Sequence, residues 1–349
     1  MIPVFDGHND FLQRMVDAGP ARDSLWLKGD GTGHLDLPRM REGGLAGGFF
    51  AIWTPSPASE DDSLAAMLKG NPPFALPLPA EVSNADSLPR ALAQAGQLMA
   101  MERTGTLAIC RSAADIHAAM AAGKIAAILH IEGAEPIANM DALHVWHAMG
   151  LRSLGPVWSR PTRYGHGVPF AFPGSPDTGD GLTDAGKDLV RECNQLRIML
   201  DLSHLNEKGF DDIAVLSDAP LVASHSCAHA VAPSTRNLTD RQLQVIAESK
   251  GLVGLNYAVG FLHPDGRRDP MHGFEVILRH LDHLLKFLGE DGVALGSDYD
   301  GAQMPEDLSD ASKVQNIVQA MLDHGYGEEL TTKIAHRNWI GVLERTWGG

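Results

Sequence analysis

The sequence predicts an α/β protein that folds as a (β/α)8 TIM barrel, with long loops over the mouth at the carboxyl ends of its strands. Eight short apolar runs are typical of buried strands, and most of the stretches between them have helical patterns. Strands that alternate with helices indicate parallel βαβ units, and eight such units in 349 residues suit this barrel. The alternative is a doubly wound open sheet, which would place ligands at one switch point instead of at most strand ends.

The elements follow from local patterns along the chain. The predicted strands are residues 3–5, 45–53, 125–131, 153–158, 198–202, 221–224, 252–257 and 293–296. The predicted helices have an apolar face or an N-terminal cap signal, and they span residues 86–103, 113–121, 141–149, 183–194, 206–216, 239–249, 274–288, 308–324 and 327–347. Two Gly- and Pro-rich loops, residues 54–86 and 160–182, each follow a strand, so we expect them to form lids or substrate walls.

Length, charge and composition narrow the class of protein. The composition, with 44% hydrophobic residues, is ordinary for a globular chain. The length fits one large α/β domain or two small ones, and we expect a single domain over residues 1–349. The formal net charge is −16 and no run rich in Lys or Arg occurs, so neither nucleic acid nor a membrane surface is an expected partner. Three scattered cysteines form no disulfide framework. With no signal-peptide pattern and no apolar run of the ~20 residues that cross a bilayer, we expect a cytoplasmic protein.

Residues that bind metal follow the predicted strands. His8 and Asp10 come after the first run, and residues two apart in a strand point the same way, about 7 Å apart along the chain. Glu132 follows the third run, His204 the fifth and His225 the sixth. One such pair could merely cap a turn, but in a barrel all of these strand ends converge on one face.

Three histidines and two carboxylates are too many for one catalytic zinc, which usually keeps three protein ligands and a water. They suit two metal ions that share a carboxylate. Glu132 is the natural bridge, with His8 and Asp10 on one ion and His204 and His225 on the other. Nitrogen and oxygen ligands favour Zn²⁺, with Mn²⁺ or Co²⁺ as substitutes. Two such ions turn a bridging water into hydroxide and polarise a carbonyl, which is the chemistry of hydrolysis.

Further polar residues at the predicted mouth have open roles. Asp298 follows the eighth run and suits a proton carrier between water and a leaving amine, with a sixth metal ligand or a helix cap as the alternative. Asp300 is interpreted as a turn residue. Arg236 either clamps a substrate carboxylate or forms a surface ion pair. His130 is a candidate to support the ligands from behind, and His166 is a candidate to line the pocket.

Taken together, these segments resemble the membrane (renal) dipeptidase family, a zinc-dependent dipeptidase branch of the metal-dependent amidohydrolase barrels. The similar motifs occur in the family's order and run nearly end to end: Asp6-Gly7-His8-Asn9-Asp10, His130-Ile131-Glu132-Gly133, Gly181-Leu182-Thr183, Asp201-Leu202-Ser203-His204, Ser224-His225-Ser226, Arg236-Asn237-Leu238, Gly296-Ser297-Asp298-Tyr299-Asp300-Gly301 and Asn338-Trp339.

The resemblance implies a barrel with two zinc ions per chain that hydrolyses dipeptides, often with a D-residue at the C-terminal position. It implies the five metal ligands named above, makes Asp298 the general acid and base, and makes Arg236 the anchor for the dipeptide's C-terminal carboxylate. The expected partner is therefore a small dipeptide, and a homodimer is a further option. One segment departs from the pattern, because Trp158 stands where the family's mammalian branch has a substrate-contacting histidine; His166 is the candidate replacement.

Two other functions remain to be weighed. An N-acyl amino acid deacylase or a lactonase on the same barrel would often carry His-x-His on its first strand and a carboxylated lysine as bridge. This chain has His-x-Asp and Glu132 in those roles. A non-catalytic metal-binding protein would lack a ligand or Asp298, and none is missing here.

Overall fold

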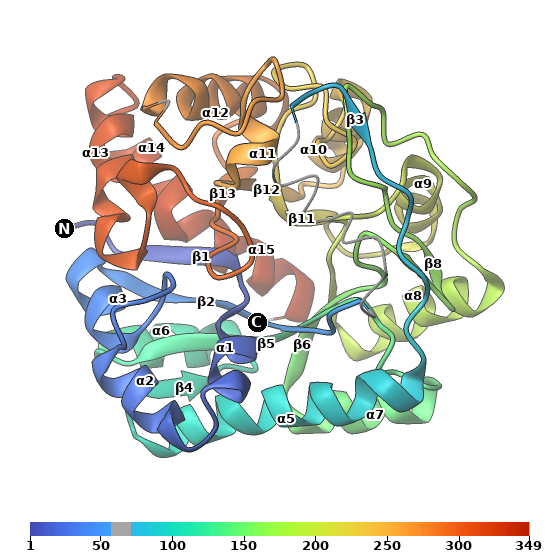
Figure 1. Ribbon diagram of the computed structural model, residues 1–349, viewed down its shortest axis with the longest axis horizontal. Coiled ribbons are helices and arrows are strands. Elements are labelled where there is room, and N and C mark those ends of the chain that lie inside the picture. The colour runs from blue at the N-terminus through green and yellow to red at the C-terminus, as the bar shows by residue number, and fades with distance from the viewer. Residues whose placement is uncertain (57–70, 272, 349) are drawn as a thin grey trace.

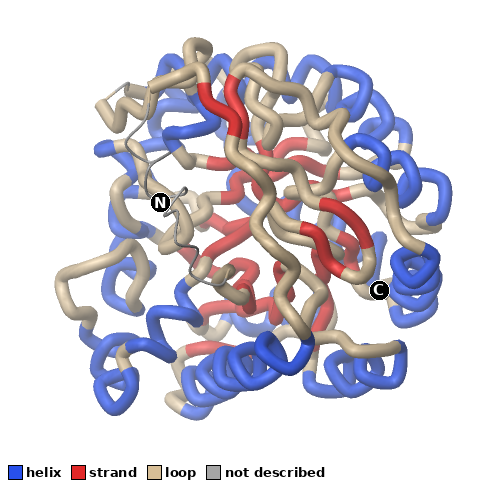
Figure 2. Tube along the Cα trace, turned by 45° about the vertical axis from the view of Figure 1, so that its right-hand side comes forward, coloured by secondary structure: helices blue, strands red, loops and turns tan. Residues whose placement is uncertain are grey.

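Eight parallel strands form the centre of the computed structural model, which describes residues 1–56, 71–271 and 273–348 (Figure 1). They are β1 (Val4–Asn9), β2 (Leu45–Trp53), β5 (Ile125–Glu132), β6 (Leu151–Gly155), β10 (Met199–Leu200), β11 (Val222–Ser226), β12 (Leu252–Asn256) and β13 (Val293–Gly296). Figure 2 shows these strands in the middle of the molecule, with helices around them.

Pairing between the strands closes them into a barrel. One parallel sheet has the order β1-β2-β5-β6-β10, and a second has the order β11-β12-β13. Parallel bridges between Asp201 and Val222 and between Asn9 and Tyr299 join the two sheets at both seams. The eight strands are those that the sequence predicts, so the predicted (β/α)8 barrel is confirmed, and the open-sheet alternative is excluded.

An additional strand was not predicted. This strand, β4 (Leu107–Ile109), pairs with the first half of β5, and β6 pairs with the second half. Three residues are too few to show a strand pattern in the sequence.

The outer helices agree with the predicted ones from residue 84 to residue 288. They are α5 (Asn84–Arg103), α6 (Ala113–Ala121), α7 (Met140–Met149), α8 (Asp184–Leu196), α9 (Glu207–Leu216), α10 (Asp240–Glu248) and α12 (Phe274–Leu288). Six of them carry side-chain N-caps on Ser, Thr or Asn of the kind that predicts a helix start: α5, α6, α7, α8, α9 and α10. The short helix α11 (Val259–Leu262) precedes α12 and lies at the mouth.

Two regions differ from the predicted helices. The segment between β1 and β2, for which we predicted no helix, contains α1 (Phe11–Asp17), η1 (Gly19–Ala21), α2 (Arg22–Lys28) and α3 (Leu37–Gly43). Each is too short to show helical periodicity in sequence. The predicted helix 308–324 is divided into two 3₁₀ turns, η2 (Glu306–Leu308) and η3 (Ala311–Lys313), and α13 (Gln315–Asp323), because the Asp310 side chain accepts from the Ser312 amide and starts a new turn.

The last helical segment closes the amino-terminal end of the barrel. It runs as α14 (Gly327–Thr332), the π-helical turn η4 (Lys333–Arg337) and α15 (Asn338–Trp347). The buried Trp339 indole donates to the Leu295 carbonyl, and its ring lies 4.8 Å from that of Phe49. A Cβ on Gly7 would meet the Ser224 carbonyl oxygen at 2.3 Å and Trp339 at 2.6 Å, so the barrel interior has no room for a side chain at residue 7.

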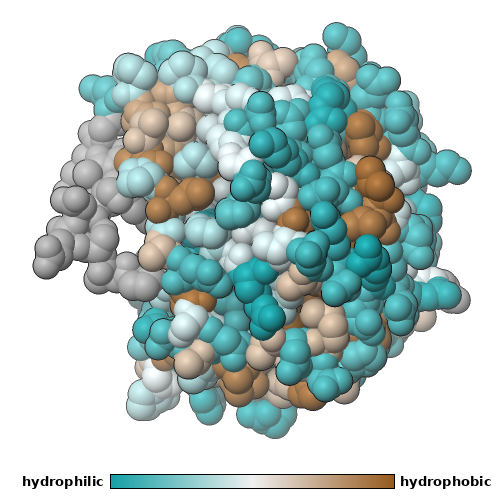
Figure 3. All heavy atoms as spheres, turned by 90° about the vertical axis from the view of Figure 1, so that its right-hand side faces the viewer, coloured by the Kyte–Doolittle hydropathy of each residue, from teal (hydrophilic) through white to brown (hydrophobic). Residues whose placement is uncertain are grey.

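The two long loops meet over the carboxyl end of the barrel. Strand β3 (Phe74–Ala75) of the first loop pairs with β9 (Ala171–Phe172) of the second, and β7 (Pro161–Thr162) pairs with β8 (Gly165–His166). Residues 57–70 of the first predicted loop lie outside the described residues. The face in Figure 3 is mainly hydrophilic, with apolar residues in small groups. In the described part of the chain, no helix is both long and apolar enough to cross a membrane.

Candidate metal centre and active site

The polar residues predicted at strand ends converge at the carboxyl end of the barrel. His8 lies in β1, Glu132 is the last residue of β5 and His225 lies in β11. Asp10 directly follows β1, and His204 lies in the loop after β10. All five side chains are buried. Burial is rare for the two carboxylates, Asp10 and Glu132, unless a cation or a hydrogen-bond donor compensates for their lost hydration.

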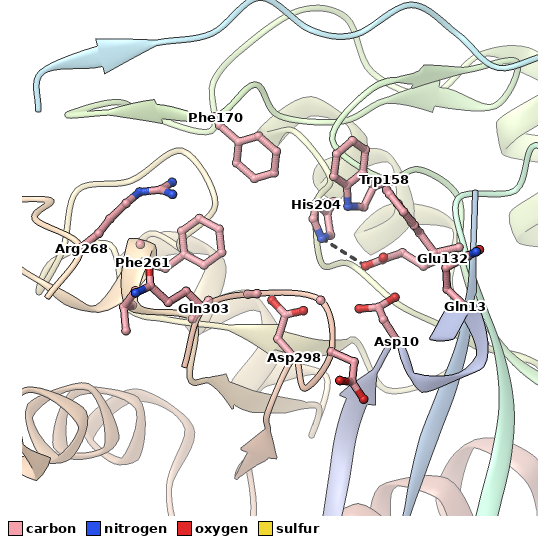
Figure 4. Close-up of a pocket in the computed structure, with 17 residues that line it drawn as sticks. Asp10, Gln13, Glu132, Trp158, Phe170, His204, Phe261, Arg268, Asp298 and Gln303 are labelled. Carbon is pink, nitrogen blue, oxygen red and sulfur yellow. Dashed lines mark ion pairs between the residues drawn. The ribbon is translucent and has the colours of Figure 1, made fainter. Parts of the chain in front are cut away.

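Three of their atoms form a nearly equilateral triangle. Glu132 Oε1 lies 3.1 Å from His204 Nε2 and 3.2 Å from His225 Nε2, and the two nitrogens are 3.1 Å apart. Figure 4 shows the first of these contacts as a dashed line. Ligands at 2.0–2.1 Å from a tetrahedral ion lie about 3.3 Å from one another, so this triangle fits one Zn²⁺-sized ion.

A second group lies on the other oxygen of the same carboxylate. His8 Nε2 is 3.3 Å from Asp10 Oδ2 and 3.8 Å from Glu132 Oε2. Among the described residues, neither ring nitrogen of His8 has a hydrogen-bond partner, although the side chain is fully buried. A buried imidazole that the protein leaves without a hydrogen bond has the lone pair that a metal ligand requires.

A third combination, His8, Asp201 and His225, also lies within reach of one ion. Asp201, however, already accepts from the Ser203 amide at 3.0 Å, from the Ser224 amide at 2.8 Å and from the Ser224 hydroxyl. Since these donors occupy its oxygens, Asp201 supports neighbouring residues instead of offering a free ligand.

Two serine hydroxyls that the sequence analysis missed orient the histidines. Ser159 Oγ lies 2.7 Å from His204 Nδ1, and Ser224 Oγ lies 2.8 Å from His225 Nδ1. Each contact leaves Nε2 pointing at Glu132. Hydrogen-bond partners of metal-binding histidines commonly orient the ring in this way. His204 has φ +68°, a conformation that costs energy in a non-glycine residue and that places its ring toward the site.

The predicted supporting role of His130 agrees with its position, whereas His166 does not line the cavity. His130 is fully buried, with Nδ1 2.8 Å from Ser153 Oγ and Nε2 3.6 Å from Asp201 Oδ2. Its ring packs edge-on against His8, 5.6 Å between centroids. His166 lies in β8 and is not among the residues that line the cavity described below.

Asp298 and Asp300 have different surroundings although only one residue separates them. Asp298 faces the cavity, and its Oδ2 accepts from Asn256 Nδ2 at 3.0 Å. Asp300 also borders the cavity, but its carboxylate forms an ion pair with Arg14 at 3.2 Å and accepts from the His34 amide at 2.8 Å. Both have positive φ, so Asp300 has the turn conformation that we predicted, and it also fixes the segment around His34.

Arg236 is a buried residue and not the partner of a surface ion pair. Only 3% of it is exposed, Nη2 donates to the His225 carbonyl at 3.2 Å, and Cζ lies 5.4 Å from the Phe261 ring centroid. Within the described residues its Nε has no hydrogen-bond partner. Arg236 itself does not line the cavity, but Phe261 does.

Burial dominates the electrostatics of the site. It raises the pKa of Glu132 and of Asp298 above their ordinary values. Burial also acts to lower the pKa of His8, but the carboxylates of Glu132 and Asp10 outweigh it and raise that pKa overall. Burial lowers the pKa of His204 and of His225 well below the ordinary value, which favours the neutral form that binds metal. Clustered carboxylates of this kind are stabilised by a bound dication.

A cavity of about 230 Å³ opens beside these groups (Figure 4). Asp10, Glu132 and Asp298 line one end of it, and Arg268 lies at the opposite end. Aromatic side chains form much of the wall between them: Trp53, Trp158, Phe170 and Phe261. Trp158 also packs 5.8 Å from the His204 ring.

A parallel barrel with buried histidines and carboxylates at the carboxyl ends of its strands defines a class, the metal-dependent hydrolases with amidohydrolase-like barrels. The sequence of residues 1–347 matches the family model of the membrane dipeptidases, peptidase family M19. The chain belongs to this family, and it is a metallo-dipeptidase. The enzyme class and the resemblance drawn from the sequence are therefore confirmed.

Two solved structures agree with this assignment, and a curated relative of similar sequence extends the comparison. A metallopeptidase from Rhodobacter sphaeroides, liganded with a phosphinate mimic of the dipeptide L-Ala-D-Ala, is 61% identical with a TM-score of 0.96 over 99% of both chains. Dipeptidase AC, a metallopeptidase of family M19, is 60% identical with a TM-score of 0.96 over 100% of this chain and 99% of the other. An uncharacterised Klebsiella pneumoniae protein from the pqqA 5′ region is 44% identical over 75% of this chain and 97% of its own length.

Proposed function

We propose that this metallo-dipeptidase holds two divalent metal ions, with zinc as the preferred metal. We also propose that it hydrolyses dipeptides that carry a D-residue at the C-terminal position. The observation that carries the two-ion proposal is the position of Glu132, which offers Oε1 to His204 and His225 and Oε2 to His8. Asp10 completes the second group. Mn²⁺ or Co²⁺ would suit the same nitrogen and oxygen ligands.

The substrate proposal is supported by the 61% identical relative whose ligand mimics L-Ala-D-Ala. The size and lining of the cavity agree with a small ligand, because aromatic walls enclose a few charged groups that would fix its orientation. The same barrel could serve a deacylase or a lactonase, but no separate observation favours either.

Bound metal ions would supply an activated water and a Lewis acid for the peptide carbonyl. The residues of the chain supply the remaining steps. Asp298 would take up the proton that the attacking water loses, at its Oδ1 oxygen, and deliver it to the nitrogen of the leaving amine. Asn256 holds the other oxygen at 3.0 Å and so keeps the carboxylate turned toward the cavity.

Substrate orientation would come from Arg236 and the aromatic wall. Arg236 lies behind Phe261 of the cavity wall, and its Nε has no partner in the described segments, so it retains a donor for the C-terminal carboxylate. Trp158 lies on the wall next to His204 and would exclude water from the scissile bond instead of replacing a substrate-contacting histidine.

The test combines a dipeptide panel with elemental analysis of the same preparation. We expect two metal equivalents per chain and faster hydrolysis of L-Ala-D-Ala than of L-Ala-L-Ala. One metal equivalent at full activity would refute the two-ion proposal, and a preference for the L,L-dipeptide would refute the substrate proposal. The cytoplasmic location and the homodimer stay predictions, to be checked by fractionation and by light scattering.

A further inference from the structure

Arg268 is a half-buried cation at the cavity, and its guanidinium has no hydrogen-bond or ion-pair partner among the residues that the structure describes. It lies between α11 and α12, and no hydrogen bond or ion pair connects its guanidinium to the described part of the chain, where its buried Nε is unsatisfied. Burial lowers the pKa of Arg268 below its ordinary value, and no carboxylate of residues 1–56, 71–271 or 273–348 offsets that effect. Within the described part of the chain, this partly desolvated charge therefore has no counter-ion to compensate for its lost hydration.

The neighbouring residue shows that this isolation is specific. Arg267 is exposed, donates to His263 Nε2, and lies 3.9 Å from both Asp265 and Asp269. The local acids therefore surround Arg267, while Arg268 turns into the cavity.

Small and aromatic residues hold the Arg268 guanidinium in place. Its Cζ lies 5.9 Å from the Phe74 ring centroid, a cation–π distance. A Cβ built on Gly260 would lie 3.3 Å from Nη2, so the guanidinium rests directly on the backbone of α11. The guanidinium is thus supported from behind by groups that cannot neutralise it.

The charges of the site give a bound dipeptide a direction. Arg268 contacts α11 at Gly260, and Arg236 lies against the next residue of α11, Phe261. Asp10 and Asp298 lie toward the opposite end of the cavity (Figure 4). A dipeptide would place its α-amine toward the acids and its carboxyl-terminal residue toward the two arginines, because each end then meets the opposite charge.

We infer that Arg268 selects dipeptides whose C-terminal residue carries an acidic side chain, aspartate or glutamate. The inference rests on the proposed function, in which Arg236 takes the α-carboxylate of that residue. Arg268 then pairs with the side-chain carboxylate, and its planar donors suit a two-point contact.

The experiment compares Ala-Asp with its uncharged isostere Ala-Asn, each with a D- and an L-residue at the C-terminal position. Wild-type kcat/KM should favour Asp over Asn by about tenfold or more, since truncating a charge pair costs more when the pair is partly desolvated. In Arg268→Met the ratio of kcat/KM for Ala-Asp to that for Ala-Asn should fall toward one, mainly because KM for Ala-Asp rises. Arg267→Met is the matched control and should keep the wild-type ratio. Arg268→Lys should restore part of it.

Each outcome decides one question. Hydrolysis of neither dipeptide by the wild type would refute the proposed function itself. Hydrolysis of both with equal kcat/KM would refute the inference alone, without any variant. A preference for Asp-Ala over Asn-Ala that depends on Arg268 would overturn the assignment to the C-terminal residue. An equal fall in the ratio for Arg267→Met would show that the general charge of the segment is responsible and would also overturn it.

Discussion

Replacing Asp298 with asparagine isolates the proton-transfer role from every structural role of this residue. In the wild type, Asn256 Nδ2 donates to Asp298 Oδ2 at 3.0 Å. The asparagine amide keeps an oxygen that can accept the same hydrogen bond. Asparagine also tolerates the positive φ of 63° at this position better than most residues do. The substitution therefore removes the titratable group and leaves the loop in place.

We expect kcat to fall by about 10²- to 10⁴-fold, the usual contribution of general acid–base catalysis. KM should change little, because the lost interaction matters chiefly in the transition state. The assay is steady-state hydrolysis of L-Ala-D-Ala, with the metal content of each preparation measured in parallel. Metal content should stay at the wild-type value.

Asp300→Asn is the matched control, since Asp300 is also buried, has φ +65° and lies two residues away. It should lower the melting temperature by weakening the ion pair with Arg14 and leave kcat close to the wild-type value. Loss of a metal ion from Asp298→Asn would show that Asp298 is a ligand. Near-normal turnover with the full metal content would show that another group carries the proton.

Three further predictions follow from the same geometry. Glu132→Ala should reduce the metal content from two equivalents to about one or fewer, because both groups use this carboxylate; an unchanged content in elemental analysis would exclude it as the bridge. Arg236→Met should raise KM for free dipeptides by roughly 10²-fold, the cost of truncating a buried charge pair, and C-terminally amidated dipeptides should already be poor wild-type substrates. Gly7→Ala should destabilise the metal-free protein by about 1–3 kcal/mol, since its Cβ would overlap the Ser224 carbonyl, whereas Gly341→Ala on α15 should be neutral or stabilising in the same thermal melts.

The wall of the barrel was predictable because each of its eight strands is a short, continuous apolar run. The exceptions have a common cause, which is length. Strand β4 has three residues, and helices α1, α2 and α3 have seven residues each, so neither periodicity repeats often enough to be recognised. The division of the predicted helix 308–324 depends on a single capping side chain, Asp310.

The candidate metal ligands were predictable for a different reason. In a parallel barrel every strand delivers its carboxyl end to the same face, so His8, Glu132 and His225 meet although they are far apart in sequence. Ser159 and Ser224 escaped notice because a hydroxyl near a histidine has no distinctive spacing. Their roles depend on which loops the barrel brings together, and that information is three-dimensional.

The role of Arg268 in substrate selectivity could not be predicted from the sequence. It is one of two consecutive arginines, and nothing in that pattern states which guanidinium is solvated and which faces the cavity. The distinction arises from the acids that surround Arg267 and from the bare backbone of Gly260 under Arg268.

The candidate metal ligands lie mainly on strands and the groups of the cavity wall lie mainly on loops, so the reaction is easier to infer from the sequence than the substrate. Four of the five candidate ligands lie in a strand or within two residues of one, where the hydrogen-bonded barrel fixes the backbone. The aromatic and cationic groups of the cavity wall come largely from loops and from the short helix α11: Trp158, Phe170, Phe261 and Arg268. Loops of this kind accept substitutions without loss of the barrel. A change at Arg268 can therefore alter which dipeptide binds while His8, Glu132 and His225 keep the same positions, so selectivity can vary independently of the hydrolytic centre.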